Sequence, residues 1–475
     1  MASRIETDSL GPIEVDMRHY WGAETERARR NFPIGSERVG REMIAALGLV
    51  KKAAALTNAE LGRLDADKAR LIAAAADEVV AGALDDQFPL SIWQSGSGTQ
   101  THMNANEVIA NRAIEMAGGT LGTKEPIDPH DDVNASQSSN DVIPTAMHLA
   151  AASAGKSRSI TARAALGATL RDKAAETGAI VKIGRTHFMD GTPLTLGQEI
   201  GGWATQLQQA ERAIERALPP IFEIALGGTA VGTGLGAPDG YAARVAQRLA
   251  EISGLPVVSA PDKRQALASH EGLLGLHGAL RTLAAALGKI AGDVRLLASG
   301  PRAGIGEISL PANEPGSSIM PGKVNPTQCE ALIMVSARVL SNDVAVSIAG
   351  MSGSLELNTM RPLLLHATMQ SIGLLADAMT SFDERAAAGI EPERARIARH
   401  LGESLMLVTA LSPHLGYDAA ARIAHDARAR GTTLREAAIS SGLLTAERFD
   451  ALVRPEDMIG EGCCSEGAAP IEKER

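Results

Sequence analysis

Two apolar seams constrain the fold of this chain more than any other feature. One runs from Leu196 to Ala217 and the other from Leu273 to Leu297, and in both the apolar residues recur in alternating steps of three and four. That spacing lines one face of an α-helix and is typical of helices that pack along their length. The sequence therefore predicts two long helices, each with a continuous buried stripe.

Less regular versions of the same pattern extend this prediction to five long helices. They cover about Asp141 to Glu176, Asn325 to Val346 and Leu365 to Met379. Aromatic residues make up only 3% of the chain, whereas Ala and Leu abound, and this balance favours helix over sheet. We predict an all-α protein with a central bundle of five long helices, which can bury more apolar surface by associating with copies of itself.

Shorter patterns flank the bundle and suggest three domains. Before the bundle we expect short helices, one of which starts at a capping box from Thr57 to Glu60 and continues to Val79; a second box runs from Thr433 to Glu436. The last residues lack apolar periodicity. The predicted division is an N-terminal domain of residues 1–138, the bundle domain of 139–390, a small C-terminal helical domain of 391–460 and a flexible tail of 461–475.

Charge and composition exclude several classes of partner. Lys and Arg total 46 against 56 Asp and Glu, and no basic cluster is interleaved with aromatics, so nucleic acid is not expected. No apolar run is long enough for a bilayer span, three cysteines make no disulfide framework, and the first residues carry no export signal. We expect a soluble, cytoplasmic protein without a membrane partner. With a net charge of -10, a site for an anion must gather local positive charge or helix N-termini.

Four polar segments at predicted helix ends are candidates for such a site. In the first, Ser97, Gly98 and Thr99 precede a helix that Asn106 and Glu107 are expected to help start. Hydroxyls and free N–H groups there suit an anion, although simple helix capping accounts for the same residue types.

The second segment places Ser138, Ser139 and Asn140 at the start of the helix near Asp141, again an arrangement that suits an anion. His130, Asp131 and Asp132 precede it and invite a metal-site interpretation. Their spacing fits no recognised ligand pattern, so we predict no metal.

The third segment holds Arg185, Thr186 and His187 in a loop before the helix at Leu196. A histidine there titrates near neutrality and can act as an acid or base, although a lone histidine is more often an ordinary surface residue. Another loop, Ala225–Pro238, is rich in glycine, but no strand is expected before it and the glycine spacing is wrong for a dinucleotide. We interpret it as a structural turn.

The fourth segment, Gly316 to Pro326, has the most unusual composition in the chain. Pro and Gly surround Ser317, Ser318, Lys323 and Asn325. Long loops between helices are usually lids or binding loops rather than connectors, and Lys323 supplies the cation that an anion site needs.

These segments, in this order, resemble those of the class II fumarases within the fumarase/aspartase superfamily. GSSIMPGKVNP looks like the superfamily signature, while GRTHFMDGTPLTLGQE, SQSSNDVIPTAMH and YWGAETERARRNFPIG look like fumarase in particular, and the resemblance runs from about Ile5 to Gly460. It implies reversible hydration of fumarate to L-malate, a step of the tricarboxylic acid cycle, without metal or cofactor. It also implies a homotetramer in which each active site draws on three chains.

The resemblance assigns roles by position. Ser317 corresponds to the base at carbon, His187 to the group that handles the proton of water, and Glu330 to the carboxylate that orients this histidine. Loss of the carbon proton leaves an aci-carboxylate, whose charge needs hydrogen-bond donors and a cation. The implied substrate-binding residues are Ser97, Gly98, Thr99, Ser138, Ser139, Asn140, Thr186, Ser318, Lys323, Val324 and Asn325.

Two alternative functions are weighed against this interpretation. The alternatives are an aspartate ammonia-lyase of the same superfamily and a structural oligomer without catalysis. His187 and Gly322 stand where aspartases carry Gln and Ala, which favours hydration.

The resemblance also implies an accessory carboxylate site, at Asp128, Pro129, His130 and Asp131. Many fumarases carry a histidine at the position of Asp128, so we predict no functional second site here.

Overall fold

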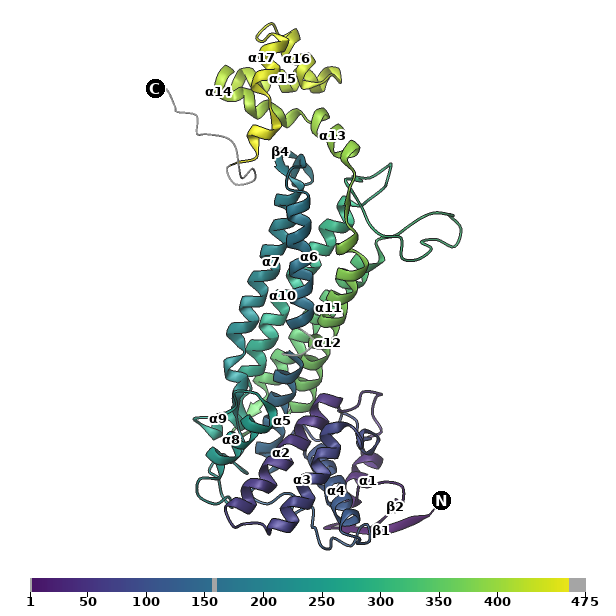
Figure 1. The fold of residues 1–475 in the computed structure, drawn as a ribbon, viewed down its shortest axis with the longest axis vertical. Helices are drawn as coiled ribbons and strands as arrows, with labels where there is room; N and C mark the ends of the chain where they lie inside the picture. The colour runs from purple at the N-terminus through teal and green to yellow at the C-terminus, as the bar shows by residue number, and fades with distance from the viewer. Residues whose placement is uncertain (1, 156–159, 461–475) are drawn as a thin grey trace. The chain divides into compact units, whose positions relative to one another are not determined.

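The computed structural model describes residues 2–155 and 160–460, and its fold is helical with a few short strands (Figure 1). The all-α prediction is confirmed. The chain divides into two compact units: unit 1 consists of residues up to Thr161, Ala210–Ala285 and Val335–Ala376, and unit 2 of Ala162–Gln209, Ala286–Met334 and the chain from Asp377 onward. Helices α7, α10, α11 and α12 contribute residues to both units.

Helices α1 to α10 include both of the predicted apolar seams. Their bounds are α1 (Ala23–Asn31), α2 (Arg41–Glu60), α3 (Ala66–Ala81), α4 (Thr99–Met116), α5 (Ser139–Ala154), α6 (Ile160–Glu176), α7 (Leu196–Ala217), α8 (Tyr241–Ser253), α9 (Lys263–Ala268) and α10 (Glu271–Leu297). The two seams therefore correspond to α7 and α10. The pattern from Asp141 to Glu176 takes in α5 and α6, and residues 156–159 between them lie outside the described residues.

The remaining helices begin with two long ones and continue with the small ones expected near the C-terminus. They are α11 (Thr327–Met351), α12 (Arg361–Arg385), α13 (Arg394–Glu403), α14 (Ser412–Leu415), α15 (Tyr417–Arg430), α16 (Leu434–Ser440) and α17 (Ala446–Leu452). The small helices surround a core that includes Leu411, Ile423 and Phe449, and α16 begins with the predicted capping box of Thr433 and Glu436. The predicted tail of residues 461–475 lies outside the described residues, and the three-domain division stays a prediction.

Long helices pack together within each unit, and polar pairs that are partly or fully buried join them. In unit 1, the ring of His277 on α10 lies 2.9 Å from Asp343 of α11 and 2.9 Å from Ser371 of α12. In unit 2, the indole of Trp203 on α7 donates to Asp293 of α10 over 3.0 Å, and Ser381 of α12 donates to Gln328 of α11. Because a buried polar atom without a partner is costly, these pairs fix which faces of the helices meet.

The strands form short ladders. The antiparallel hairpins are β1 (Ser3–Asp8) with β2 (Gly11–Asp16), β3 (Val181–Thr186) with β4 (Met189–Thr195), and β8 (Gly353–Ser354) with β9 (Leu357–Asn358); β7 (Ile308–Ser309) pairs with β10 (Glu391–Pro392), and β5 (Glu223–Ile224) runs parallel to β6 (Val258–Ser259). The expectation that no strand precedes the glycine-rich loop at Ala225 was wrong, because β5 ends there. It has only two residues, so the loop lacks the βαβ setting of a dinucleotide site.

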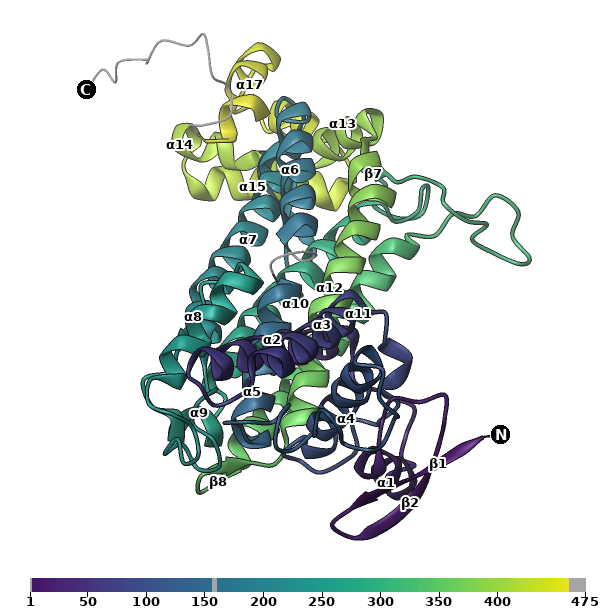
Figure 2. The same cartoon turned by 60° about the horizontal axis from the view of Figure 1, so that its bottom comes forward.

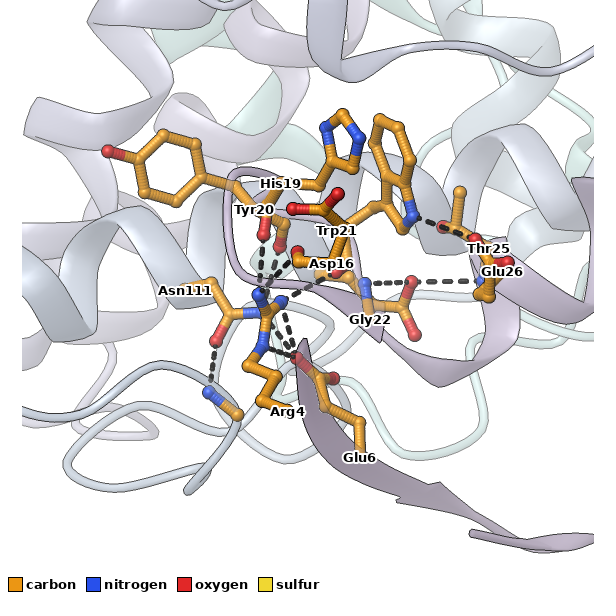
Figure 3. A network of polar contacts seen from close by, with 12 residues as sticks. Arg4, Glu6, Asp16, His19, Tyr20, Trp21, Gly22, Thr25, Glu26 and Asn111 are labelled. Carbon is orange, nitrogen blue, oxygen red and sulfur yellow. Dashed lines mark hydrogen bonds and ion pairs between the residues drawn. The ribbon is translucent and has the colours of Figure 1, made fainter. Parts of the chain in front are cut away.

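Within unit 1, Arg4 links the first hairpin to the residues that precede α1. Figure 3 shows the guanidinium of Arg4, which bonds to the carboxylate of Glu6 and to the carbonyl oxygens of His19 and Trp21. Helix α1 begins shortly after Trp21. The carboxylate of Glu107, on α4, accepts hydrogen bonds from the backbone N–H groups at the start of α1, over 2.8 to 3.1 Å. Glu107 thus caps α1 from a distance, as a carboxylate at a helix N-terminus does.

Two predicted helix starts were wrong. Thr57 and Glu60 lie in the last turn of α2, because the apolar pattern already continues from Met43 through Leu47 and Val50. The neighbouring helix α3, which lies against α2 (Figure 2), is capped instead by Asp65, whose carboxylate accepts from the N–H groups of residues 67 and 68. Asn106 and Glu107 do not start α4 either, since this helix begins at Thr99 and both residues are buried within it.

Candidate active site

The first polar segment forms the N-terminus of α4. Gly98 precedes the helix with a φ of 78°, and a Cβ there would crowd Ile143 at 3.1 Å, so both conformation and space favour glycine. The hydroxyl of Ser97 lies 2.7 Å from that of Thr99 and 2.8 Å from that of Ser95. Gly98 has no side chain to cap the helix, and the amide oxygen of Gln94 instead accepts from the N–H of Thr101 over 3.0 Å. Within the described residues the hydroxyls of Ser97 and Thr99 bond to each other rather than cap the helix, so capping does not account for them and they can serve an anion at the helix start.

A cavity of about 340 Å³ borders this segment at Gly98 and Thr101. Its lining is mainly apolar, with Met43, Ile143 and Leu365 among the contributing side chains. Arg38, Arg361 and His366 also line it, but most of its wall is apolar and suits a carboxylate less well than the polar segments do. The polar segments remain the better candidates for an anion site.

The second segment forms the N-terminus of α5 through a capping box. The hydroxyl of Ser138 accepts from the N–H of Asn140, and the carboxylate of Asp141 accepts from the N–H of Ser138 over 2.9 Å. The same carboxylate accepts from the N–H groups of Gly227 and Thr229. The glycine-rich loop is therefore held against this helix start, and its Ala230 carbonyl accepts from the Asn140 side chain over 2.7 Å.

The N-termini of α4 and α5 lie next to each other in unit 1. A direct hydrogen bond joins them, because the Nδ1 atom of His102 on α4 lies 2.7 Å from the hydroxyl of Ser139 on α5. The two segments thus bring hydroxyls, an amide and two helix N-termini together. Such a surface attracts a carboxylate.

The third segment is a hairpin, and not the plain loop that was expected. Thr186 pairs with Met189, which leaves His187 and Phe188 as a two-residue turn. Both turn residues have positive φ, 56° and 61°, a combination usually met by Asn-Gly. The imidazole of His187 is exposed at the tip. Strain of this kind costs roughly 1–3 kcal/mol per residue and is characteristic of functional sites.

A buried ion cluster anchors this hairpin within unit 2. Arg185 donates to both oxygens of Glu307 over 2.6 and 3.0 Å, His400 lies 2.9 Å from the same carboxylate, and Lys182 lies 3.1 Å from it. Burial alone would raise the pKa of Glu307, but Arg185, Lys182 and His400 outweigh it and lower this pKa to about 2. The cluster holds Arg185, the residue before Thr186, in place.

We expect Glu307→Gln to destabilise the protein by roughly 3 kcal/mol at neutral pH, since the pKa of Glu307 falls from 4.5 to about 2 on folding. A lowered folded-state pKa contributes stability above pH 4.5, and this contribution disappears as the pH falls toward 2. Urea unfolding of the wild type and the variant should therefore differ at pH 7 and converge in acid. The exposed Glu391 gives the control, Glu391→Gln, which should shift stability little. Equal stability of Glu307→Gln and wild type at pH 7 would contradict the assignment.

The fourth segment folds back on itself. The N–H of Gly316 donates to the carbonyl of Lys323, and the Asn325 side chain donates to the carbonyl of Gly316 over 2.6 Å. A Cβ on Gly316 would collide with that Lys323 carbonyl, so this close approach requires glycine. Between these two points the chain turns at Gly322, which has a φ of 80°.

Within this loop the hydroxyl oxygen of Ser317 accepts two backbone hydrogen bonds. The N–H of Met320 donates over 3.0 Å and that of Ile319 over 3.3 Å. Donors aimed at an oxygen favour its ionised form. The Lys323 side chain is exposed, and no carboxylate pairs with it in residues 2–155 and 160–460. Its positive charge is therefore available to an anion.

Glu330 lies in the first turn of α11, with its carboxylate 3.9 Å from Arg295. In the described part of a single chain it makes no hydrogen bond to His187. Sequence reasoning placed Ser138 with Ser139 and Ser317 with Asn325, as the geometry has them. It missed His102 and Lys51, both buried, because a single histidine or lysine inside a helical pattern carries no local signal.

The residues of the doubtful accessory site are engaged elsewhere. The carboxylate of Asp128 accepts from the N–H groups of His130 and Asp131, and the His130 ring lies 2.9 Å from Glu24. Glu24 raises the pKa of His130, despite partial burial. Carboxylates also line the adjoining hollow, so an anion would meet negative charge there. In the described residues, no three His, Cys, Asp or Glu side chains gather as a metal ion requires.

Comparisons with known proteins place this geometry in a family. A family model described as Lyase matches residues 11–341, and one described as Fumarase C C-terminus matches residues 407–460. The chain is 57% identical to the class II fumarate hydratase of Ralstonia nicotianae, covering 97% of this chain and 100% of that one. It is 58% identical to the class II fumarate hydratase of Chromobacterium violaceum, with 96% and 99% covered. A solved class II fumarase from Schistosoma mansoni superposes with a TM-score of 0.94 at 41% identity, covering 96% of this chain and 99% of that chain.

Proposed function

Because this chain belongs to the class II fumarate hydratases of the fumarase/aspartase superfamily, we propose that its four polar segments form the site that hydrates fumarate to L-malate. The reaction is reversible and is a step of the tricarboxylic acid cycle. The observation that carries the proposal is similarity over nearly the whole length, together with a loop in which Ser317 accepts two backbone N–H donors and the Lys323 side chain is exposed.

The mechanism begins, in the direction of dehydration, at the methylene carbon of L-malate. The Ser317 oxygen, ionised with the help of the N–H groups of Ile319 and Met320, takes one methylene proton. The electron pair moves into the adjacent carboxylate and forms an aci-carboxylate, which Lys323 and Asn325 stabilise by charge and hydrogen bonding. Collapse of this intermediate forms the double bond and expels hydroxide, which receives a proton from His187 to leave as water.

The other polar residues bind the substrate. The hydroxyls of Ser97, Thr99, Ser138, Ser139 and Ser318, the amide of Asn140 and the Thr186 side chain supply donors to its carboxylates, with Gly98 and Val324 completing the segments. Glu330 orients and polarises His187 from a neighbouring chain, so a hydrogen bond between these two residues within one chain is not expected. No metal or cofactor takes part in this scheme, and we place the enzyme in the cytoplasm.

The test is a direct assay. Wild-type protein dialysed against a chelator should convert L-malate to fumarate, followed by the ultraviolet absorbance of the double bond. The absence of any change with either L-malate or fumarate would overturn the proposal. Release of ammonia from aspartate would replace it with the ammonia-lyase alternative, and inactivity toward all three compounds would favour the structural oligomer.

A homotetramer is the assembly that this mechanism requires. Helix α11 carries a stripe of exposed apolar residues at helical spacing, in which Val344, Ile348 and Met351 are 60%, 50% and 80% exposed. In the described residues α11 is also the one helix long and apolar enough to cross a membrane by length and composition alone. Val339, Val346 and Ala349 on the opposite face of α11 are buried, so this helix is apolar on both faces. An exposed apolar stripe on such a helix suits burial against further copies of the chain.

We therefore expect Val344→Asp to break up the oligomer, because a carboxylate in an apolar interface is left without a partner. Light scattering should give a smaller mass than for the wild type, and turnover at low protein concentration should fall roughly tenfold or more as the shared sites come apart. Leu10, in the turn between β1 and β2, is 80% exposed and gives the matched control, Leu10→Asp, with unchanged mass. An intact tetramer in the Val344 variant would rule out this surface.

A further inference from the structure

Behind Ser139 lies a buried chain of hydrogen-bonding groups that the mechanism above does not use. The hydroxyl of Ser139 lies 2.7 Å from Nδ1 of His102, and Nε2 of the same ring lies 2.7 Å from the Nζ of Lys51. Lys51 belongs to α2 and His102 to α4, and both side chains are fully buried. A buried amine thus stands two hydrogen bonds from a hydroxyl assigned to the substrate.

The direction of the hydrogen bonds around Lys51 is fixed by two amides. The NH₂ group of Gln137 donates to the carbonyls of Val133 and Ala135, so its oxygen faces Lys51 at 2.9 Å. Asn134 likewise turns its oxygen toward Lys51, at 3.4 Å. Lys51 therefore donates to both amides whatever its charge, and only its contact with His102 can reverse.

Two arrangements of protons follow from this geometry. A charged Lys51 has three N–H donors, so the third points at Nε2 of His102; the proton of the neutral ring then lies on Nδ1 and is donated to Ser139. The Ser139 hydrogen is left free to point at a ligand. A neutral Lys51 has only two N–H donors, so it accepts from Nε2, and Nδ1 then accepts from Ser139. Ser139 would in that case present lone pairs to the ligand.

We propose that Lys51 and His102 are positioning residues that hold the Ser139 hydroxyl as a hydrogen-bond donor toward a carboxylate of the substrate. The proposal rests on the function assigned above to Ser139. It also meets the charge requirement of an anion site in an acidic protein, because a dianion at Ser139 favours the charged form of Lys51. Charged Lys51 thus acts on the substrate through His102 and Ser139, without contacting it directly.

The charges around Lys51 and His102 set the pH range in which the hydrogen bonds from Lys51 to Ser139 reverse their direction. Burial lowers the pKa of Lys51 well below its ordinary value, and Asp141, on α5, opposes this change. Burial also lowers the pKa of His102, with Lys51 and His130 acting in the same direction. The ring therefore stays neutral, and Lys51 is the group that titrates. Since the donor arrangement needs charged Lys51, affinity for a dicarboxylate should decrease as the pH rises.

The experiment measures binding of succinate, a dicarboxylate that cannot react, by calorimetry on the intact oligomer across pH 6 to 9. His102→Leu removes the donor to Ser139. His102→Asn keeps an amide N–H in the place of Nδ1, but an amide cannot exchange donor and acceptor by moving a proton. The matched control is Ser136→Ala, in the loop that also holds Gln137. It removes the buried hydrogen bond from Ser136 to Asn58 and leaves the hydrogen bonds from Lys51 through His102 to Ser139 intact.

The Kd of succinate should rise roughly tenfold in His102→Leu, the effect of losing about 1.4 kcal/mol of hydrogen bonding, and stay within about threefold of wild type in His102→Asn at neutral pH. Wild type and Ser136→Ala should lose affinity at alkaline pH, whereas His102→Asn should not. An alkaline loss of affinity in His102→Asn equal to that of wild type would overturn the proposal, and this comparison decides even if the Leu variant fails to fold. A wild type that binds succinate but does not hydrate fumarate would instead count against the proposed function.

Discussion

Replacing Ser317 by alanine should lower the turnover of L-malate by roughly 10²- to 10⁴-fold, the usual contribution of a general base. The substitution removes the atom that takes the methylene proton but keeps the hydrogen bonds that close the loop, from the Gly316 N–H to the Lys323 carbonyl and from the Asn325 side chain to the Gly316 carbonyl. The loop and the fold should therefore persist. Unfolding curves should coincide with those of the wild type, which separates lost chemistry from lost structure.

Exchange of the methylene proton of L-malate with solvent deuterium gives the sharper measurement. This exchange needs the base but no cleavage of the carbon–oxygen bond, so Ser317→Ala should abolish it. The matched variant is Ser318→Ala, next in the chain, which should raise KM for L-malate while exchange continues at saturating substrate. Near-normal exchange in Ser317→Ala, or an equal loss of exchange in both variants, would refute the role of Ser317.

The sequence predicted the framework because helix-forming patterns are local. The seam that starts at Leu196 and ends at Ala217 coincides with α7, since side chains three and four apart must share a face. The hairpin that carries His187 escaped prediction for a related reason. Its strands include Gly184, Gly191 and Pro193 and lack an apolar alternation, and they are held by Glu307, which is distant in sequence. Nothing local indicates that contact.

The candidate site was predicted in pieces rather than as a whole. Hydroxyl and amide side chains at helix starts are visible in sequence, so the segments of Ser97, Ser138 and Ser317 could be named. The link from Ser139 to Lys51 could not, because it joins three elements through two buried side chains that resemble core residues. Glu330 and His187 likewise belong together only in the proposed assembly, which the pattern of one chain does not encode.

His187→Asn should also lower turnover by roughly 10²- to 10⁴-fold, but through the oxygen rather than the carbon. His187 occupies a turn with a φ of 56°, and asparagine tolerates that left-handed conformation better than most residues. The hairpin should therefore survive the substitution. An amide does not titrate near neutrality, so the variant cannot protonate the departing hydroxide. Proton abstraction by Ser317 is left intact.

The two variants should consequently separate the two halves of the reaction. His187→Asn should retain exchange of the methylene proton with solvent deuterium while net formation of fumarate fails, whereas Ser317→Ala should lose both. The exposed His414 of α14, in unit 2, gives the control, His414→Asn, with normal turnover. If His187→Asn lost exchange and turnover to the same degree, the histidine would act at carbon as well. The assignment of base and acid to two loops would then have to be abandoned, since it depends on each proton having its own group.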